Sequence, residues 1–440
     1  MESLLVRHEN REIVVFSKKK QHYLVPIDRS SREKFMKVLE LSKKGEWRES
    51  IDPEFTRDLD AMGFDGNFRE LFSNDPSYDL MAPLELYFDF TNKCNLRCKE
   101  CYNQHHLGST TMPPEKVREV IHEAYSMGIM RLHLAGGEPA MEPEGLLNYL
   151  SIARELGLVT SMSTNGTLIN EELCRKILAN NLFAFTVSID GPNEKMNGDL
   201  RYPKSFDKAI NTLITAKRIK RELGIETRVC MKSVCSRETS DETIEDLVKM
   251  GMGFEVDEIK FYSVERSLNH EQGHYGKSVD KYYRMLLFMD KMKEKYSGII
   301  NVSPVINPVI GGCLIGVPGV KGCLGANELL TINPDGSITP CLMMKRTVGN
   351  VYSTSLEDFW KNSPDLKKYR EEIRSPECNT CGTYNSCRGG CQVRKKVEYG
   401  KLEGVDPLCP RSYDPGVEPK MLKVRGDIKF FRGIFNAHSL

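Results

Sequence analysis

Three cysteines lie close together on one short segment of the chain. The segment TNKCNLRCKECYNQ places Cys94, Cys98 and Cys101 at CxxxCxxC spacing, and the next cysteine along the chain is Cys174. Biological four-iron four-sulfur clusters are usually held by four cysteine thiolates, so three thiolates leave one iron open to a ligand from outside the protein. A zinc site or unligated core cysteines are the alternatives, but zinc favours paired CxxC motifs and a complete tetrahedral set. The triplet predicts an iron–sulfur cluster with one reactive iron.

A second group of eight cysteines falls between residues 313 and 409. Seven of them follow an order in which a lone cysteine precedes a GxxxxC segment, the segment CNTCGTYNSCRGGC and a final cysteine: Cys323, Cys341, Cys378, Cys381, Cys387, Cys391 and Cys409. The spacings inside CNTCGTYNSCRGGC would also suit a zinc ribbon. The residues alone therefore indicate metal ligation here without choosing between zinc and iron.

The overall composition supports metal ligation and limits the possible partners. The chain has 14 cysteines in 440 residues, and disulfides are disfavoured in a reducing compartment. Its 62 Lys and Arg residues balance 61 Asp and Glu residues, so no single-sign field would attract nucleic acid or an anionic membrane. No apolar run approaches the roughly 20 residues that span a bilayer, and MESLLVRHENRE lacks the order of a signal peptide. We expect a soluble, cytoplasmic protein that binds neither nucleic acid nor a membrane.

The elements that would position these cysteines alternate between apolar runs and amphipathic stretches. Six apolar runs indicate strands, at 84–90, 131–135, 159–164, 183–190, 227–234 and 258–264. Five stretches with apolar residues three and four positions apart indicate helices, at 114–128, 144–157, 170–181, 205–224 and 240–251. Gly128, Gly157, Gly224 and Gly251 stand where these helices would end in a left-handed C-cap. The pattern predicts an α/β fold, a partial (β/α)6 TIM-like barrel with functional loops at the C-terminal ends of its strands.

Two regions flank the barrel pattern. The N-terminal region is a small α+β module, with strands expected at 12–17 and 22–27 around a lysine-rich turn and helices near 30–45 and 53–63. The C-terminal region is rich in Gly, Pro and Cys, so ligands rather than a large apolar core would hold it together. The expected domains are the module at 1–80, the barrel at 84–305, the Cys-rich domain at 309–412 and a tail at 413–440.

The loop CNLRCKEC resembles the signature of the radical S-adenosylmethionine (SAM) superfamily. The resemblance implies that Cys94, Cys98 and Cys101 hold a [4Fe-4S] cluster whose open iron is chelated by the amino and carboxylate groups of SAM. Reductive cleavage of SAM would give a 5′-deoxyadenosyl radical that takes hydrogen from the substrate, while the protein positions the cofactor and excludes water. The position before the third cysteine is often aromatic in this superfamily and is Glu100 here, with Tyr102 just beyond.

Three polar segments at predicted strand ends would hold the cofactor. AGGEP offers glycines for close backbone approach and a carboxylate that accepts hydrogen bonds from an ammonium, whereas STNG and SIDG could also be ordinary turns or helix caps. The resemblance assigns AGGEP to the methionyl amino group, SIDG to the ribose hydroxyls and STNG to the cofactor's polar end. The implied contacts are Gly136, Gly137, Glu138, Pro139, Ser163, Asn165, Ser188 and Asp190.

The order of the seven C-terminal cysteines resembles the full SPASM domain, which carries two auxiliary [4Fe-4S] clusters in many radical enzymes. Carried over, that pattern gives one outer cluster, one inner cluster and a candidate fourth inner ligand in Cys313. The outer ligands would be Cys378, Cys381, Cys387 and Cys409, and the inner ligands Cys323, Cys341 and Cys391. The inner cluster would accept the electron that is released when a substrate radical is oxidised. The outer cluster would exchange this electron with a carrier such as flavodoxin or ferredoxin. Cys174, Cys230 and Cys235 are expected to be buried structural thiols.

The N-terminal module resembles a shortened leader-peptide recognition domain of maturases that act on ribosomally made peptides. Such a domain captures a leader by adding it as a strand to a sheet edge. This implies a precursor peptide with leader and core as the partner, and a thioether or carbon–carbon crosslink, or an epimer, as the product. No catalytic acid or base is named, because its geometry is not in the sequence. Lys232, Lys260 and Tyr262 could reach the barrel interior and receive no role.

Other functions are compatible with the same motifs. An anaerobic sulfatase-maturating, formylglycine-forming enzyme would place Asp directly after the cysteine of the GxxxxC segment, whereas Leu342 and Met343 follow Cys341 here. A small-molecule radical SAM oxidoreductase is a further alternative, and a binding protein whose clusters only store electrons is another. Loss of peptide binding on removal of the N-terminal module would separate the peptide hypothesis from the last two.

Overall fold

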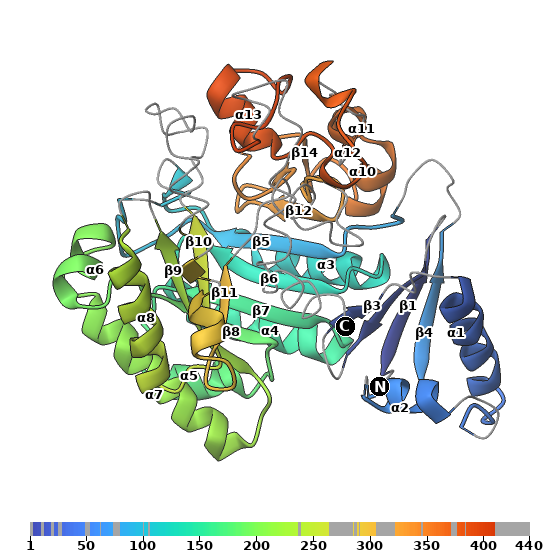
Figure 1. The fold of residues 1–440 in the computed structure, drawn as a ribbon, viewed down its shortest axis with the longest axis horizontal. Coiled ribbons are helices and arrows are strands. Elements are labelled where there is room, and N and C mark those ends of the chain that lie inside the picture. Colours follow the sequence, from blue (N-terminus) through green and yellow to red (C-terminus); the bar gives the residue numbers. More distant parts are fainter. Residues whose placement is uncertain are drawn as a thin grey trace.

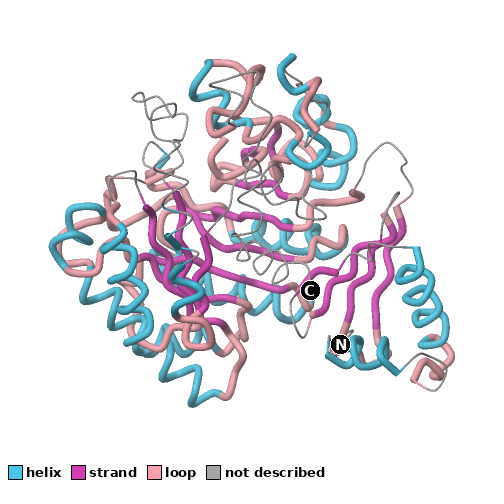
Figure 2. Tube along the Cα trace, viewed as in Figure 1, coloured by secondary structure: helices cyan, strands magenta, loops and turns pink. Residues whose placement is uncertain are grey.

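The computed structural model has a small N-terminal sheet, a central sheet wrapped by helices and a C-terminal group of short helices (Figure 1). Figure 2 shows the central strands as one curved sheet with helices along its outer side. The structure describes residues 3–9, 13–18, 22–24, 29–48, 53–61, 63–73, 80–99, 101–103, 106–235, 239–263, 285, 288–289, 291–304, 322–344, 346–370, 376–382 and 384–409.

The N-terminal module is built on four strands and two helices. β1 (Leu4–His8), β2 (Ile13–Ser17), β3 (His22–Leu24) and β4 (Phe68–Phe72) pair in the order β3-β2-β1-β4, and α1 (Arg29–Ser42) and α2 (Pro53–Ala61) lie between β3 and β4 in the chain. The two expected strands and both helices are present, although the second strand is described only at 22–24. The sequence pattern did not predict β1 and β4, because their parallel pairing joins distant parts of the chain.

Alternate side chains of this sheet serve two different cores. Leu4, Val6, Ile13 and Val15 pack in the module's own core, together with Phe35, Val38, Leu39, Trp47, Leu59 and Phe64. Leu5, Val14 and Phe16 point to the opposite face and belong to the main core of the molecule. Since successive side chains of a strand face opposite sides, the module is packed on both faces of its sheet.

One buried ion pair also fastens the module to the centre. The side chain of Arg7 is fully buried and pairs with the carboxylate of Glu9 at 2.6 Å. The same guanidinium donates to the carbonyl oxygens of Ala82 at 2.6 Å and Pro83 at 3.1 Å, and Glu9 accepts from the backbone N–H of Met81 at 2.7 Å. Removing either partner would leave an uncompensated buried charge.

The central part repeats a strand and a helix along the chain. Its strands are β5 (Glu85–Thr91), β6 (Arg131–Gly136), β7 (Val159–Thr164), β8 (Ala184–Ser188), β9 (Arg228–Cys235) and β10 (Glu258–Ser263), all paired in parallel with their neighbours. The helices that alternate with them are α3 (Pro114–Ser126), α4 (Pro143–Leu156), α5 (Glu171–Leu178), α7 (Phe206–Leu223) and α8 (Asp241–Gly253). The predicted six strands, five helices and partial barrel are confirmed.

Several details differ from the prediction. α6 (Glu194–Leu200) is an extra short helix after β8, and β11 (Asn301–Pro304) adds a further parallel strand beside β10. Gly157 and Gly224 are left-handed C-caps as predicted, with φ of 78° and 62°. Gly251 does not cap α8, which continues to Gly253, because the apolar pattern runs on through Met250 and Met252.

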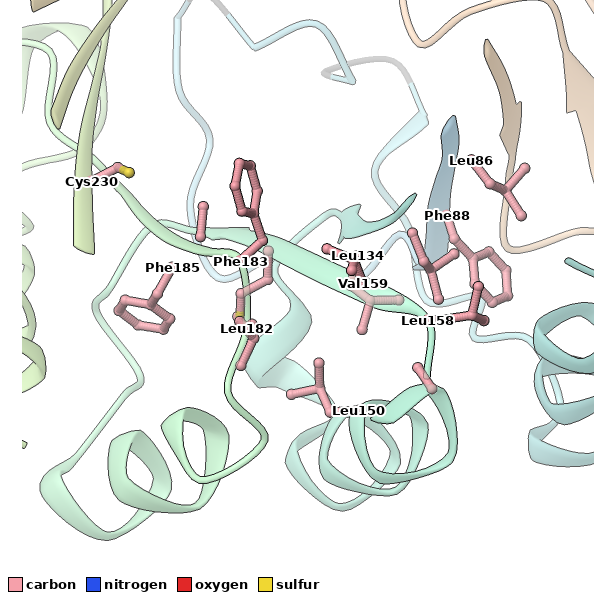
Figure 3. Close-up of a cluster of buried hydrophobic side chains, with 14 of the residues drawn as sticks. Leu86, Phe88, Leu134, Leu150, Leu158, Val159, Leu182, Phe183, Phe185 and Cys230 are labelled. Carbon is pink, nitrogen blue, oxygen red and sulfur yellow. The ribbon is translucent and has the colours of Figure 1, made fainter. Parts of the chain in front are cut away.

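The two faces of the central sheet differ in chemistry. Leu86 and Phe88 of β5, Leu134 of β6 and Phe185 of β8 are fully buried toward the helices, and Figure 3 shows them around Leu150 of α4. The intervening positions on these strands face the barrel interior and carry polar side chains. The apolar core therefore lies on the helical side of the sheet. The polar side chains in the barrel interior are available for binding or catalysis.

The Cys-rich part continues the same sheet. β12 (Leu329–Ile332) pairs in parallel with β5, and β13 (Ser337–Thr339) and β14 (Gly349–Asn350) follow as antiparallel strands. The helices are α10 (Leu356–Asn362), α11 (Pro364–Arg370), α12 (Tyr384–Cys387) and α13 (Gln392–Tyr399). The expectation that this part lacks an apolar core is wrong for α10, because Leu356, Phe359 and Trp360 are buried in the main core. Within the described residues, no helix has both the length and the apolar character needed to span a membrane.

Candidate functional site

The cysteine triplet lies on the loop that follows β5, at the C-terminal ends of the central strands. This loop is hydrogen-bonded to the turn after β6. The backbone N–H of Gly137 donates to the carbonyl of Thr91 at 2.8 Å, and that of Glu138 donates to the carbonyl of Lys93 at 2.7 Å. Side chains at Gly136 and Gly137 would overlap the carbonyl oxygens of Thr91 and Lys93. The two glycines of AGGEP are therefore required for the close approach of the turn and the loop.

Two further strand ends hold the cysteine loop. The side chain of Asn165, after β7, donates to the side-chain oxygen of Asn95 at 2.9 Å, and Asn95 donates to the Thr167 hydroxyl at 2.8 Å. The N–H of Lys99 donates to the carbonyl of Leu200 at the end of α6, at 3.0 Å. The loop is thus held at the strand ends by the segments after β6, β7 and β8.

Burial disfavours the charged thiolate form of Cys94 and Cys98. Burial, together with Glu138 and the other two cysteines, raises the pKa of Cys94 to about 11, and burial also raises the pKa of Cys98. Such thiols become thiolates when cationic iron compensates their charge. Among the described residues, no three His, Cys, Asp or Glu side chains converge on a point for a single metal ion. The assignment of the loop to an iron–sulfur cluster rests on the number and spacing of its cysteines.

Glu138 is a buried carboxylate beside the cysteine loop. One oxygen accepts from the Thr164 hydroxyl at 2.6 Å and from the Ala140 N–H at 3.1 Å, and the other accepts from the Asn165 N–H at 2.6 Å. Burial nevertheless raises the pKa of Glu138. A carboxylate offers about four lone-pair positions, so roughly one remains for an external donor. The arrangement fits an ammonium group delivered next to Cys94. Pro139 follows as the first residue of a single 3-10 turn, Pro139–Met141.

The other predicted cofactor contacts are held by protein groups. The Ser163 hydroxyl lies 3.2 Å from Nε2 of His133 and faces the barrel interior, and Asn165 is occupied by the loop contacts described above. Ser188 is buried at the end of β8. Asp190 accepts from the Val234 N–H at 2.8 Å and pairs with Arg201 at 2.7 Å. All four side chains lie at the C-terminal strand ends or just inside the barrel.

Arg201 is a site residue that the sequence analysis missed. Arg201 follows α6. Its guanidinium forms an ion pair with Asp190 and interacts electrostatically with Cys98 and Cys101. The neighbouring Asp190 carboxylate raises the pKa of Arg201 against the effect of burial, which keeps the guanidinium charged. It offers a fixed cation next to the cluster loop, suited to an anionic group of a ligand. An arginine in the loop segment after SIDG was the available sequence signal.

The barrel interior beneath this loop holds a second set of polar side chains. Nδ1 of His133 lies 2.7 Å from the Ser161 hydroxyl, and the His133 ring lies 4.8 Å from that of Tyr87. Burial and the nearby Lys232, Lys260 and Arg131 lower the pKa of His133 to about 3, so its imidazole is neutral at physiological pH. Lys232, Lys260 and Tyr262, which the sequence analysis left without a role, are part of this interior.

The second cysteine group is brought together in two places. Cys387 packs against Cys409, and the N–H of Cys381 donates to the carbonyl of Cys378 at 3.1 Å. Gly325, two residues after Cys323, lies against Cys341, because an added Cβ at Gly325 would lie 3.2 Å from Cβ of Cys341. The assignment of these cysteines to an outer and an inner cluster stays a prediction. Cys313 lies outside the described residues. Cys174, Cys230 and Cys235 are buried as expected.

The fold and this site define a class of partial-barrel protein with a three-cysteine loop at its strand ends and a second cysteine domain on the sheet edge. The chain belongs to the radical SAM superfamily and carries a SPASM domain. The family model of the Radical SAM superfamily matches residues 88–251, and that of the SPASM iron–sulfur cluster-binding domain matches residues 323–382. The protein is therefore a radical SAM enzyme.

Three known proteins illustrate the similarity. The mycofactocin maturase MftC of Mycobacterium tuberculosis is 25% identical over 363 residues, covering 79% of this chain and 87% of its own. The AdoMet-dependent heme synthase of Methanosarcina barkeri is 26% identical over 363 residues, covering 76% and 98%. The crystal structure of Streptococcus suis SuiB bound to S-adenosylmethionine superposes with a TM-score of 0.71 at 18% identity, covering 93% of this chain and 99% of that one. The SuiB likeness extends over the N-terminal module and shows the shared fold.

Proposed function

We propose that this enzyme oxidatively crosslinks a ribosomally made peptide through a thioether or carbon–carbon bond, or epimerises one of its residues. The observation that carries the proposal is the N-terminal module. Its sheet is packed on both faces, against its own helices and against the main core, and its order β3-β2-β1-β4 leaves strands at both edges. A leader peptide can add to such an edge through main-chain hydrogen bonds. SuiB, which shares the fold, has also been solved with its precursor peptide SuiA.

The cysteine loop and its surroundings would hold the radical-forming cofactors. Cys94, Cys98 and Cys101 would supply three thiolates to a [4Fe-4S] cluster, and the Glu138 carboxylate, held by Thr164 and Asn165, would accept a hydrogen bond from the amino group of SAM. Arg201 neutralises anionic charge beside the loop. Once bound, the cluster and SAM supply a 5′-deoxyadenosyl radical. The chain's own part is to fix this loop through Gly137 and to exclude water from the interior.

The Cys-rich domain would receive the electron that a crosslink releases. A dehydrogenative crosslink removes two hydrogens from the peptide, one as a hydrogen atom taken by the radical and the other as a proton and an electron. We assign the electron to an inner auxiliary cluster held by Cys323, Cys341 and Cys391, and its onward transfer to an outer cluster held by Cys378, Cys381, Cys387 and Cys409. A flavodoxin or ferredoxin would then exchange electrons with the enzyme.

The test uses reduced holoenzyme, SAM and the small peptide encoded beside its gene. A crosslink lowers the peptide mass by two hydrogens, and an epimer made in D2O gains one deuterium. An unchanged peptide, under conditions where 5′-deoxyadenosine forms, would count against the proposal. As a control, a scrambled leader attached to the same core should lower the rate of modification.

Oxidation of a small molecule is the second candidate function. It is favoured by the similarity to a heme synthase over 98% of that protein's length. The two candidates differ in what the module must do, because a small molecule needs no leader. Hydrogen exchange of one of the edge strands, β3 or β4, would slow on addition of a leader peptide if the module binds it, and unchanged exchange would favour the small-molecule candidate.

A further inference from the structure

The barrel interior contains a cation that no described residue neutralises. Lys232 on β9 faces the interior, and its ammonium lies 5.3 Å from the ring centroid of Tyr262 on β10. Among the described residues, the ammonium of the partly buried Lys232 makes neither an ion pair nor a hydrogen bond. Lysines that point into a protein interior are usually paired, because even partial removal of an ammonium from water is costly.

The nearest carboxylates are already engaged by other cations. Asp190 pairs with Arg201 at 2.7 Å and accepts from a backbone N–H at 2.8 Å. Glu258 is shared between Lys260 and Arg228, each at 3.5 Å, and also accepts from the Ser303 hydroxyl at 2.6 Å. Glu258 thus pairs with two cations, and Asp190 already pairs with the guanidinium of Arg201.

The register of the strands places these groups in one layer. Ser188 on β8, Lys232 on β9 and Lys260 on β10 are direct neighbours across the parallel ladders. Lys232 also lies within the electrostatic reach of Cys101 and Arg201, which places the layer just beneath the cysteine loop. A substrate atom in front of this layer would therefore be close to the site of radical formation.

We propose that Lys232, supported by Lys260 and Tyr262, binds a carboxylate of the substrate, so that the peptide segment entering the barrel carries Asp or Glu next to the modified position. This inference rests on the proposed function and names the substrate class of the same site. The neutral His133 and the tyrosine hydroxyls in the interior add hydrogen-bonding capacity without competing charge. The carboxylate supplies the missing counter-ion and aligns the segment under the cluster loop.

The test measures binding to the SAM-loaded holoenzyme by anaerobic calorimetry. The probes are capped pentapeptide amides, identical except for Asp, Asn or Lys at the centre. Wild-type enzyme should bind the Asp peptide about tenfold more tightly than the Asn peptide, as expected for a charge-assisted hydrogen bond. Lys232→Gln should abolish this preference and leave the Asn peptide unaffected, whereas Lys232→Arg should retain most of it. Lys176→Gln, which removes an exposed lysine of α5, is the matched control and should behave as wild type.

Four results would overturn the inference. The first is equal binding of the Asp and Asn peptides to wild-type enzyme, and the second is an equal loss of binding of both peptides in Lys232→Gln. The third is a tenfold loss of SAM affinity in that variant, which would make Lys232 a cofactor contact. Displacement of the Asp peptide by equimolar succinate would indicate a site for free carboxylates and would also contradict it. Iron content and thermal unfolding identify a misfolded variant, and Lys232→Arg keeps the test decisive. A normal peptide mass change without Asp preference contradicts this inference alone, and Asp preference without any mass change contradicts only the proposed function.

Discussion

Arg394 and Asp406 form a fully buried ion pair at 2.7 Å in the Cys-rich domain. The Asp406 carboxylate also accepts a hydrogen bond from the backbone N–H of Cys391 at 2.5 Å. The backbone carbonyl of Asp406 accepts one from the N–H of Cys409 at 2.7 Å. One aspartate therefore positions both Cys391, the N-cap residue of α13, and Cys409. In the ligand assignment that we propose, these two cysteines belong to different clusters, which would place the ion pair between the inner and outer sites.

Substitution Asp406→Asn should destabilise the Cys-rich domain and lower its iron content. The change leaves the Arg394 guanidinium buried without a counter-charge, which typically costs about 3–5 kcal/mol. We expect a lower unfolding midpoint and loss of auxiliary iron, with the iron of the Cys94 loop retained. Asp365→Asn is a matched control, since Asp365 and Arg346 form an exposed pair at 3.7 Å whose removal should cost less than about 1 kcal/mol. Equal iron content in the two variants would show that Asp406 does not position the ligands.

Replacement of Cys94, Cys98 and Cys101 together by Ala should abolish formation of 5′-deoxyadenosine. The auxiliary iron should remain, because the Cys-rich domain is supplied by other cysteines. Iron analysis and electron paramagnetic resonance of the reduced protein measure the remaining clusters. Persistent cleavage of SAM in this variant would overturn the assignment of the loop. Replacement of the buried Cys174 by Ala is the control, and it should leave cofactor cleavage intact.

Substitution Glu138→Gln should weaken SAM binding about tenfold or more. The buried carboxylate has roughly one unused lone-pair position facing the cysteine loop, and a charge-assisted hydrogen bond there contributes about 1.5–3 kcal/mol. Calorimetric titration of the holoenzyme with SAM measures the change. Glu144→Gln, at an exposed position in the first turn of α4, is the control. Equal affinity of the two variants would exclude Glu138 as a contact of the SAM amino group.

The central barrel was predictable because its signals are local. Each strand and helix has its own apolar period, and the cysteine loop follows a strand whose pattern fixes where it ends. The additional pairings were not predictable in this way. β4 joins β1 and β12 joins β5 across long stretches of chain, and no short segment records such a partner.

The site shows the same division between local and distant signals. AGGEP and the cysteine spacing are visible as motifs, whereas Arg201 becomes a site residue only because α6 turns back so that its guanidinium meets Asp190. The proposed role of Lys232 depends on which cations pair with Asp190, in the loop after β8, and with Glu258, on β10. Interior side chains can be placed on a face by alternation, but their charge balance requires the assembled barrel.

The low pKa of His133 should make the folded protein less stable in mild acid. Its folded-state pKa of about 3 lies below the unfolded value near 6.5, so the unfolded chain binds the proton first and stability is lost as pH falls through 6.5. At pH 5.5 this term costs about 1.4 kcal/mol relative to pH 8. Urea unfolding of wild type and His133→Gln at both pH values isolates it. The variant should lose less stability than wild type, and His122→Gln on the surface of α3 should not differ from wild type. Parallel pH dependence in all three proteins would contradict a neutral buried imidazole.

Arg7 and Glu9 should act as a coupled unit that fastens the N-terminal module to the barrel. Arg7→Met leaves the Glu9 carboxylate buried beside Met81 without its cation, and we expect a loss of about 3–5 kcal/mol in urea unfolding. The double variant Arg7→Met/Glu9→Gln should be more stable than Arg7→Met, because no buried charge remains unpaired. Lys44→Met removes an exposed lysine paired with Glu40 and should change stability by less than about 1 kcal/mol. Glu9→Gln alone completes the comparison. If the double variant loses the sum of the losses of Arg7→Met and Glu9→Gln, the two residues contribute independently. If it recovers stability, the two residues are coupled and together fasten β1, an inner strand of the sheet whose edge we propose for the leader, and Arg7→Met should also slow peptide modification without affecting SAM cleavage.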